Sequence, residues 1–251
     1  MTDHTPKMPI LDRPGLTGAA WTYPPGTAIA FHAHPAGQLI HAISGSMRVS
    51  VQGMLWVLPI GRALWIPPDV EHAIWCGGEV QMRTAYVSPA CLSTPSGLQL
   101  ISVSALAREV LVRLSESTED VLHPILGALL LHEIAAGSIR PFCLPIPFEP
   151  RLTRLVEALR ADPASGETIG DWAKKLGFSE RSLIRRIRDE TGMTFRELRR
   201  HTRIMTAIER LGKSRSVTGV AYDVGFGTPS SFIHAFRTVT GKTPRQFMSG
   251  T

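Results

Sequence analysis

The sequence of 251 residues is short of cysteine and of long apolar runs. Its three cysteines, Cys76, Cys91 and Cys143, form no CxxC pair and are odd in number, which argues against a disulfide framework and favours a reducing compartment. No apolar segment reaches the length of a bilayer span, and residues 1–14 lack the apolar stretch of a signal peptide. We therefore expect a cytoplasmic protein with no membrane partner.

Motifs of several enzyme classes are absent as well. The sequence has no GxSxG nucleophile motif, no Walker loop and no dinucleotide-binding glycine loop. Hydrophobic residues make up 43% of the chain, so a sizeable core can form and a wholly disordered chain is excluded. A chain of this length holds one large domain or two of ordinary size.

Positive charge is concentrated in the last hundred residues. Residues 1–147 contain 8 Lys and Arg against 10 Asp and Glu, a net charge of −2, whereas residues 148–251 contain 19 against 11, a net charge of +8. A basic half joined to a nearly neutral half is typical of a nucleic-acid-binding domain with a partner domain. A solvated basic helical face explains the same charges equally well, so the charge alone does not identify the function.

The N-terminal third alternates between short apolar stretches and turn signals. Many short strands with regularly spaced turns predict a small antiparallel barrel or sandwich. The stretches include residues 29–31, 38–43, 47–51, 55–58 and 63–66.

From Val103 onward, apolar residues recur at helical spacing. This period predicts helices over Ser104–Glu116 and Asp120–Ala136. The second helix is apolar on more than one face, so we expect it to lie near or in the interface of a homodimer. The segment 140–150 contains four prolines and is predicted to be a stiff linker.

The C-terminal hundred residues contain an internal repeat. Ala173–Phe178 aligns with Ala221–Phe226, and each copy is predicted to form a helix, a glycine-containing turn and a second helix. Gly177 and Gly225 stand where the first helix of each copy has to end in a left-handed conformation. The capping box of Thr194 and Glu197 predicts a long helix between the copies. The expected helices span residues 168–176, 179–190, 194–211, 217–224 and 228–239.

The second copy, GFGTPSSFIHAFRTVTGKTP from Gly225 to Pro244, closely resembles the C-terminal signature of AraC/XylS-family transcription regulators. The resemblance covers roughly residues 151–247. It implies two helix-turn-helix units that dock on one face of DNA in successive major grooves, with the second helix of each unit reading bases. It also implies double-stranded operator DNA as a partner, and RNA polymerase if the protein is an activator.

Outward positions near the start of each reading helix are the candidate DNA contacts. Arg181 and Arg185 share a face, and arginine can bind guanine through two hydrogen bonds. Leu183 and Ile187 are expected to point into the core, and the less basic second unit is expected to read weakly or to contact mainly phosphate. The candidates are Glu180, Arg181, Ile184, Arg185 and Arg188 in the first unit and Thr228, Pro229, Ser230, Ile233, His234 and Arg237 in the second. We interpret the linking-helix arginines, at positions 196, 199, 200 and 203, as solvated or phosphate-facing charge.

The strand region resembles the cupin family through two motifs. GTAIAFHAHPAGQLIHAISG, from Gly26 to Gly45, matches the first motif with Gln38 where metal-binding cupins have Glu. GRALWIPPDVEH, which ends at His72, matches the second motif with an aspartate in place of the usual glycine. The resemblance implies a double-stranded β-barrel whose inner wall brings together His32, His34, Gln38 and His72. Imidazoles at positions i and i+2 of one strand face the same side, so His32 and His34 can converge on one ion.

Three interpretations of this polar cluster stay open. His32, His34, His72 and Gln38 can hold a divalent metal ion, although a Gln in place of Glu removes a negative charge and weakens the binding of a cation. A metal-free pocket for an organic effector and a vestigial structural site are the other two. His41, Cys76 and one or two of the tryptophans at positions 21, 56, 65 and 75 are further candidates for the wall of the cavity.

The leading hypothesis is a one-component transcription regulator that is not an enzyme, with a small-molecule or metal effector in the cupin pocket and operator DNA on the helical half. The alternatives are a metal-dependent cupin enzyme and a constitutive DNA-binding protein whose barrel only dimerises. The expected fold is α+β in two domains. They comprise a cupin barrel over residues 1–102, a helical dimerisation segment and linker over 103–147, and an all-α domain with two helix-turn-helix units joined by a long helix over 148–251.

Overall fold

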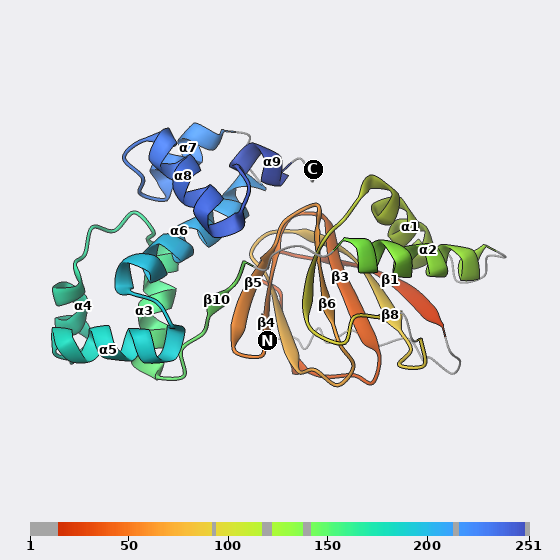
Figure 1. Ribbon diagram of the computed structural model, residues 1–251, viewed down its shortest axis with the longest axis horizontal. Helices are drawn as coiled ribbons and strands as arrows, with labels where there is room; N and C mark the ends of the chain where they lie inside the picture. Colours follow the sequence, from red (N-terminus) through yellow and green to blue (C-terminus); the bar gives the residue numbers. More distant parts are fainter. Residues whose placement is uncertain (1–14, 92–93, 117–121, 138–141, 213–215, 249–251) are drawn as a thin grey trace. The chain divides into compact units, whose positions relative to one another are not determined.

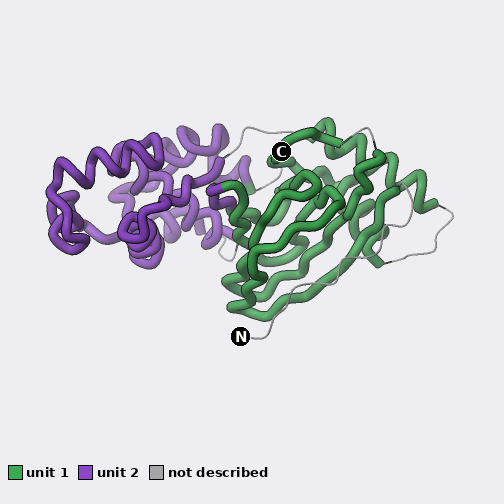
Figure 2. Tube along the Cα trace, turned by 90° about the horizontal axis from the view of Figure 1, so that it is seen from below, with its two compact units in different colours: residues 1–52, 57–141, 248–251 green, residues 53–56, 142–247 purple. Residues whose placement is uncertain are grey.

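The computed structural model describes residues 15–91, 94–116, 122–137, 142–212 and 216–248, and the chain divides into two compact units (Figure 1, Figure 2). The first unit contains the chain up to residue 52 and residues 57–141, and the second contains residues 53–56 and 142–247. Among the described residues, no helix is both long and apolar enough to cross a membrane.

Two β-sheets form the framework of the first unit. Their strand orders are β1-β8-β3-β6-β9 and β10-β5-β4-β7-β2. In β4, buried residues alternate with half-buried ones, as expected for a strand with one face in the core. The strands are β1 (Leu16–Tyr23), β2 (Ala28–His32), β3 (Gly37–Ser44), β4 (Met47–Val51), β5 (Met54–Leu58), β6 (Arg62–Ile66), β7 (His72–Cys76), β8 (Val80–Val87), β9 (Gln99–Ser102) and β10 (Leu144–Pro145).

Helices α1 (Ala105–Glu116) and α2 (His123–Ala136) pack on the first of these sheets. Leu111 of α1 and Leu130 of α2 share a buried cluster with Trp65 of β6, and this cluster is the core between the helices and the sheet. The predicted ends of both helices at Glu116 and Ala136 are confirmed, while residues 117–121, which include the expected start at Asp120, lie outside the described residues. The predicted α+β class with a cupin-like strand region is thus confirmed.

The second unit is helical apart from its short strand segments, and it contains both predicted helix-turn-helix units. Ser179 and Thr228 accept backbone hydrogen bonds as the N-caps of the two reading helices, and the predicted capping box of Thr194 and Glu197 opens the long helix between the units. The helices are α3 (Pro150–Ala161), α4 (Ile169–Leu176), α5 (Glu180–Thr191), α6 (Phe195–Leu211), α7 (Val217–Asp223), α8 (Pro229–Thr240) and α9 (Pro244–Met248).

The prediction of a stiff linker over 140–150 is wrong in its described part. Leu144 and Pro145 form β10, which pairs with Leu55 and Met54, and Leu144 is fully buried in the core of the second unit. Pro150 is the first residue of α3, a helix that the sequence analysis did not identify. A proline suits the first position of a helix because its missing N–H has no partner there in any case, so the same residue that suggested a linker begins a helix.

Gly177 and Gly225 have positive φ angles of 69° and 82°, as their places after α4 and α7 predict. Their surroundings differ. A Cβ atom at Gly177 would meet nothing within 4 Å, whereas a Cβ atom at Gly225 would lie 2.7 Å from the Cα of Ala164 and 2.8 Å from Nη2 of Arg203. The second turn is therefore a close approach of two backbone segments, and the first is not.

We expect Gly177→Ala to lower the free energy of unfolding by about 1–2 kcal/mol, which is the strain of a non-glycine residue in the left-handed region. Gly225→Ala should lower it by more, because the backbone at Ala164 has to move as well. Denaturant unfolding of the two full-length variants measures the difference. Equal losses for the two would contradict the close approach at Gly225.

Candidate functional site

Three histidines gather between β2, β7 and the segment after β2, and two of them contact Gln38 of β3 in the other sheet. The ring nitrogens of His32, His34 and His72 that could bind a metal all lie within 4.8 Å of one another. His34 and His72 are buried and His32 is half-buried. The expectation that His32 and His34 share a strand is wrong, because β2 ends at His32 and His34 lies in the following turn. The backbone of this turn is held by Asp69, whose N–H donates to the carbonyl of His34 at 2.9 Å.

Each of the three rings uses its Nδ1 atom in the same way. The Nδ1 atoms of His32, His34 and His72 lie 2.9, 2.7 and 2.9 Å from the carbonyl oxygens of residues 30, 36 and 70. A carbonyl oxygen only accepts hydrogen bonds, so Nδ1 carries the hydrogen in each ring. In a ring whose Nδ1 carries its single hydrogen, Nε2 presents a lone pair, which is the arrangement that histidine ligands of metals usually have.

The orientation of the Gln38 amide follows from its neighbours on β8. The Thr84 hydroxyl donates to the carbonyl of Leu39 at 2.8 Å, so its oxygen can only accept from Gln38. Gln38 Nε2 donates to Thr84 Oγ1 and to the Tyr86 hydroxyl, both at 3.1 Å. The amide oxygen must therefore point at the histidines, where it lies 3.1 Å from Nε2 of His34 and 3.1 Å from Nε2 of His72.

The cluster thus presents four acceptor atoms, which are the Nε2 atoms of the three histidines and the amide oxygen of Gln38, and no free donor. Burial lowers the pKa of His72 to about 4, so this ring is neutral at neutral pH and does not supply a hydrogen from Nε2. Imidazole nitrogens and an amide oxygen are suitable ligands for a divalent cation, and such a cation satisfies all four acceptors at once. The residues present therefore fit the metal that the cupin resemblance implies, in spite of the missing carboxylate.

The further candidates of the pocket wall separate into two groups. Cys76 lies four residues after His72 on β7 and shares its face. His41 is three residues from Gln38 on β3 and faces the opposite side, so the expectation that it lines the cavity is wrong. Its Nδ1 donates to the carbonyl of Arg62 at 2.9 Å, and burial lowers its pKa to about 4. Trp65 is fully buried in the core beneath the helices instead.

The reading-helix candidates lie on the surface of the second unit. Leu183 and Ile187 of α5 are fully buried, as predicted, and Pro229 at the start of α8 is half-buried. The exposed candidates are Glu180, Arg181, Ile184, Arg185 and Arg188 in the first unit and Thr228, Ser230, Ile233, His234 and Arg237 in the second. Each reading helix therefore presents a continuous outer face of candidate residues.

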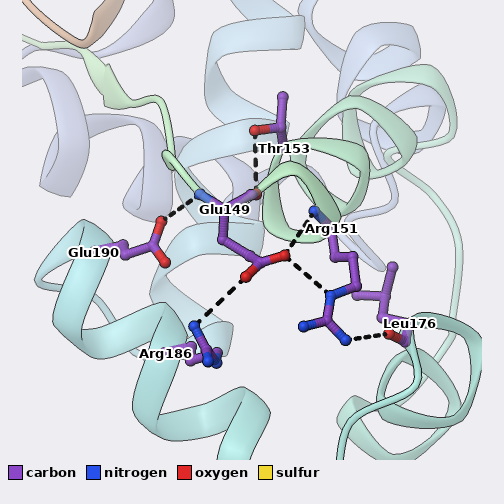
Figure 3. Close-up of polar contacts among 6 residues, drawn as sticks. All are labelled: Glu149, Arg151, Thr153, Leu176, Arg186 and Glu190. Atoms are coloured by element: carbon purple, nitrogen blue, oxygen red, sulfur yellow. Dashed lines mark hydrogen bonds and ion pairs between the residues drawn. The ribbon is translucent and has the colours of Figure 1, made fainter.

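A polar network that sequence analysis did not identify fixes α5 against the start of α3 (Figure 3). The carboxylate of Glu149 accepts from Nε of Arg151 at 3.0 Å and lies 3.5 Å from Nη1 of Arg186, while the Glu149 amide donates to Glu190 at 3.0 Å. The side-chain hydrogen bond from Arg151 holds the pKa of Glu149 below its ordinary value. Arg186 is thus a structural residue, whereas its neighbour Arg185 is exposed.

Two linking-helix arginines are not the solvated charges that we expected. Arg203 donates from Nε to the carbonyl of Pro163 at 2.7 Å and from Nη1 to the carbonyl of Gly225 at 2.8 Å. Arg199 donates to the carbonyl of Glu167. Both side chains join α6 to segments beside the two helix-turn-helix units, and long-range contacts of this kind leave no local signal in a sequence.

Comparisons with known proteins cover both halves of the chain. Residues 19–88 match the cupin domain family, and residues 172–250 match a helix-turn-helix domain family. The chain is 29% identical over 222 residues to the HTH-type transcriptional regulator NimR of Escherichia coli K12, which covers 87% of this chain and 81% of NimR. It is 34% identical over 106 residues to the HTH-type transcriptional regulator RipA of Corynebacterium glutamicum, which covers 42% of this chain and 32% of RipA.

The chain also aligns with solved structures. ToxT of Vibrio cholerae aligns with 94% of this chain and 99% of its own, at 12% identity and a TM-score of 0.42. A DNA-binding transcriptional dual regulator of Escherichia coli K-12 aligns with 45% of this chain and 95% of its own, at 23% identity and a TM-score of 0.37.

We expect Gln38→Glu to lower the stability of the metal-free protein by about 1–3 kcal/mol, because the carboxylate is buried and no longer donates to Thr84 and Tyr86. The same variant should bind Ni²⁺ more tightly than the natural protein, since the added negative charge favours a cation. Thermal unfolding with and without Ni²⁺ measures both effects. His34→Ala is the matched control, and Ni²⁺ should stabilise it least. An equal Ni²⁺ effect in all three proteins would contradict a metal site here.

Proposed function

We propose that this chain, which belongs to the AraC/XylS family of transcription regulators and carries an N-terminal cupin domain, senses an effector in the histidine cluster and binds operator DNA with both helix-turn-helix units. The observation that carries the proposal is the pair of capped helices, α5 and α8, whose candidate residues lie mostly exposed while Leu183 and Phe232 are buried beneath them. The net charge of +8 over residues 148–251 supports a polyanionic partner.

Within this proposal the three segments of the chain have separate tasks. Residues 1–102 are the sensor, residues 103–147 provide the dimer contact, and residues 148–251 bind DNA. RNA polymerase is a further partner if the protein activates transcription. We assign the chain no catalytic role, because the relatives that it matches carry the names of transcription regulators.

The effector site in this proposal consists of His32, His34, Gln38 and His72. The accounting of hydrogen-bond donors favours a divalent cation over a metal-free pocket, because every inward-facing atom of the set accepts. Gln38 leaves the site with one negative charge fewer than a cupin that has Glu, so a bound divalent ion would retain a stronger attraction for an anionic group of an organic effector. Thr84 and Tyr86 keep the Gln38 oxygen pointed inward in either case.

Base reading by α5 can be tested once full-length protein has selected its sites from a random duplex pool. Arg181→Ala and Arg185→Ala should weaken binding to the selected duplex by roughly 1–3 kcal/mol and change binding to random duplex little, because these arginines lie in the first turns of the helix. Arg188→Ala, in the last turn, should weaken both duplexes alike. Affinity measurements at fixed salt on both DNAs distinguish the two classes. Equal losses on both DNAs for Arg181 and Arg185 would make them phosphate contacts.

The outer face of α2 supports a homodimer. Leu122 and Ile125 are 51% and 64% exposed, and Leu129, one to two turns further along, is half-buried against the core of the first unit. Leu130 and Ile134 point instead into the core of the first unit. This end of α2 is thus packed on one side and carries exposed apolar residues on the other. An exposed apolar strip of this kind suits contact with a second copy of the same chain.

We expect the protein to sediment as a dimer at micromolar concentration and Ile125→Glu to sediment as a monomer with nearly unchanged stability, because Ile125 is exposed in the single chain. Phe31→Glu, at a residue that is 58% exposed on β2, introduces the same charge away from α2 and should remain dimeric. A monomeric natural protein, or an Ile125→Glu variant that stays dimeric, would count against this interface.

A further inference from the structure

A cleft in the second unit is lined by an unusual excess of positive charge. It has a volume of about 410 Å³ and lies between α6 and the first half of α8. Its lining includes four arginines of α6 and no carboxylate, and Ser231 and His234 of α8 lie on its other side. We propose that this cleft binds a phosphate group, and that the phosphate belongs to the backbone of duplex DNA. The inference rests on the proposed DNA binding for the source of the phosphate.

The arginines gather on one face of α6 because of their spacing. Positions 196, 199, 200 and 203 follow the i, i+3, i+4, i+7 pattern of a single helical face. Like charges at these separations repel one another on a helix. The lining contains no carboxylate, and the two carboxylates that act on these arginines from outside it, Glu167 on Arg199 and Glu197 on Arg200, offset only part of the four positive charges. An anion in the cleft is therefore favourable.

Two of the arginines are held in place and two are available. Arg203 donates to the carbonyls of Pro163 and Gly225, at 2.7 and 2.8 Å, and Arg199 donates to that of Glu167. Neutral carbonyls fix these guanidinium groups without cancelling their charge. Arg196 and Arg200 form no hydrogen bond or ion pair through their side chains with any other described residue. Nε of Arg200 is buried, so the terminal N–H groups of its guanidinium are the donors available to a ligand.

The donor chemistry selects a phosphate. Guanidinium groups offer several N–H donors in a planar fork that matches phosphate oxygens, and groups from different helical turns can approach a tetrahedral anion from several directions. The hydroxyl of Ser231 donates to the carbonyl of Thr228 at 2.8 Å, so the arginines and the His234 ring are the donors that remain.

The place of the cleft explains why the phosphate would come from DNA. His234 lines the cleft and also lies on the exposed outer face of α8, which is the face proposed to enter the groove. That face carries only one arginine, Arg237, among its candidate residues. The arginines of α6 would therefore supply the backbone contacts that the second reading helix lacks.

The test uses full-length protein and a duplex of random sequence, since phosphate contacts do not depend on sequence. Arg200→Gln and Arg196→Gln should each weaken binding by about tenfold, as expected for the loss of a charge-assisted hydrogen bond. The slope of log affinity against log salt should also fall by about 0.9 for a lost phosphate contact. Arg154→Gln removes the same charge from an exposed site on α3 outside the cleft and should change binding far less. Arg200→Lys should recover part of the loss.

A second measurement distinguishes the source of the phosphate. Thermal unfolding is compared in inorganic phosphate and in chloride at equal ionic strength, for the natural protein and for Arg200→Gln. One outcome is that phosphate stabilises the natural protein but not Arg200→Gln, while Arg200→Gln and Arg154→Gln bind DNA equally well. That outcome would assign the cleft to a free phosphate and overturn DNA as the source. No difference between Arg200→Gln and Arg154→Gln in either measurement would overturn the cleft as a phosphate site. A natural protein that binds no duplex would contradict the proposed function, and the phosphate measurement would then decide on the cleft alone.

Discussion

The Arg203 guanidinium is the interaction on which the arrangement of the DNA-binding unit depends. It extends from the linking helix α6 to the carbonyl of Pro163, ahead of the first helix-turn-helix, and to the carbonyl of Gly225, in the turn of the second. One planar group thus connects α6 to both helix-turn-helix units. It can do so because Gly225 has no Cβ atom, which would lie 2.8 Å from this side chain. Arg203 and Gly225, 22 residues apart, therefore join α6 to the turn between α7 and α8.

A comparable constraint orders the polar cluster of the first unit. The carbonyl of Leu39 fixes the hydroxyl of Thr84, that hydroxyl fixes the amide of Gln38, and backbone carbonyls fix the rings of His32, His34 and His72. Each step follows from the rule that a carbonyl oxygen only accepts. The result is a site whose inward atoms all accept, and its chemistry is determined by residues that touch no ligand. A substitution at Thr84 would remove one of the two acceptors that orient the Gln38 amide and leave the Tyr86 hydroxyl as the other.

Local signals in the sequence account for the parts of the fold that were predicted. The glycines after α4 and α7, the capping residues Ser179 and Thr194, and the periodicity of α5 and α6 each depend on neighbours within one or two turns. The parts that were missed depend on distant partners. Thr84 and Tyr86 lie 46 and 48 residues from Gln38, and no pattern around them marks their role. The prolines of 140–150 led to the wrong prediction of a linker for a related reason. Leu144 in this segment is buried and pairs with Leu55, a partner far away in the sequence.

The segment from Leu144 to Glu149 is joined to α5 in two ways. Leu144 of β10 packs in one core with Leu155 of α3 and Leu183 of α5, so the strand is part of the first helix-turn-helix and not a free tether. A few residues later, Glu149 accepts from Arg151 and pairs with Arg186, and its amide is held by Glu190. Two side chains of α5 thus contact Glu149, the N-cap residue of α3. Leu144 and Glu149 thus contact α5, the helix with the more basic outer face, through this core and this network.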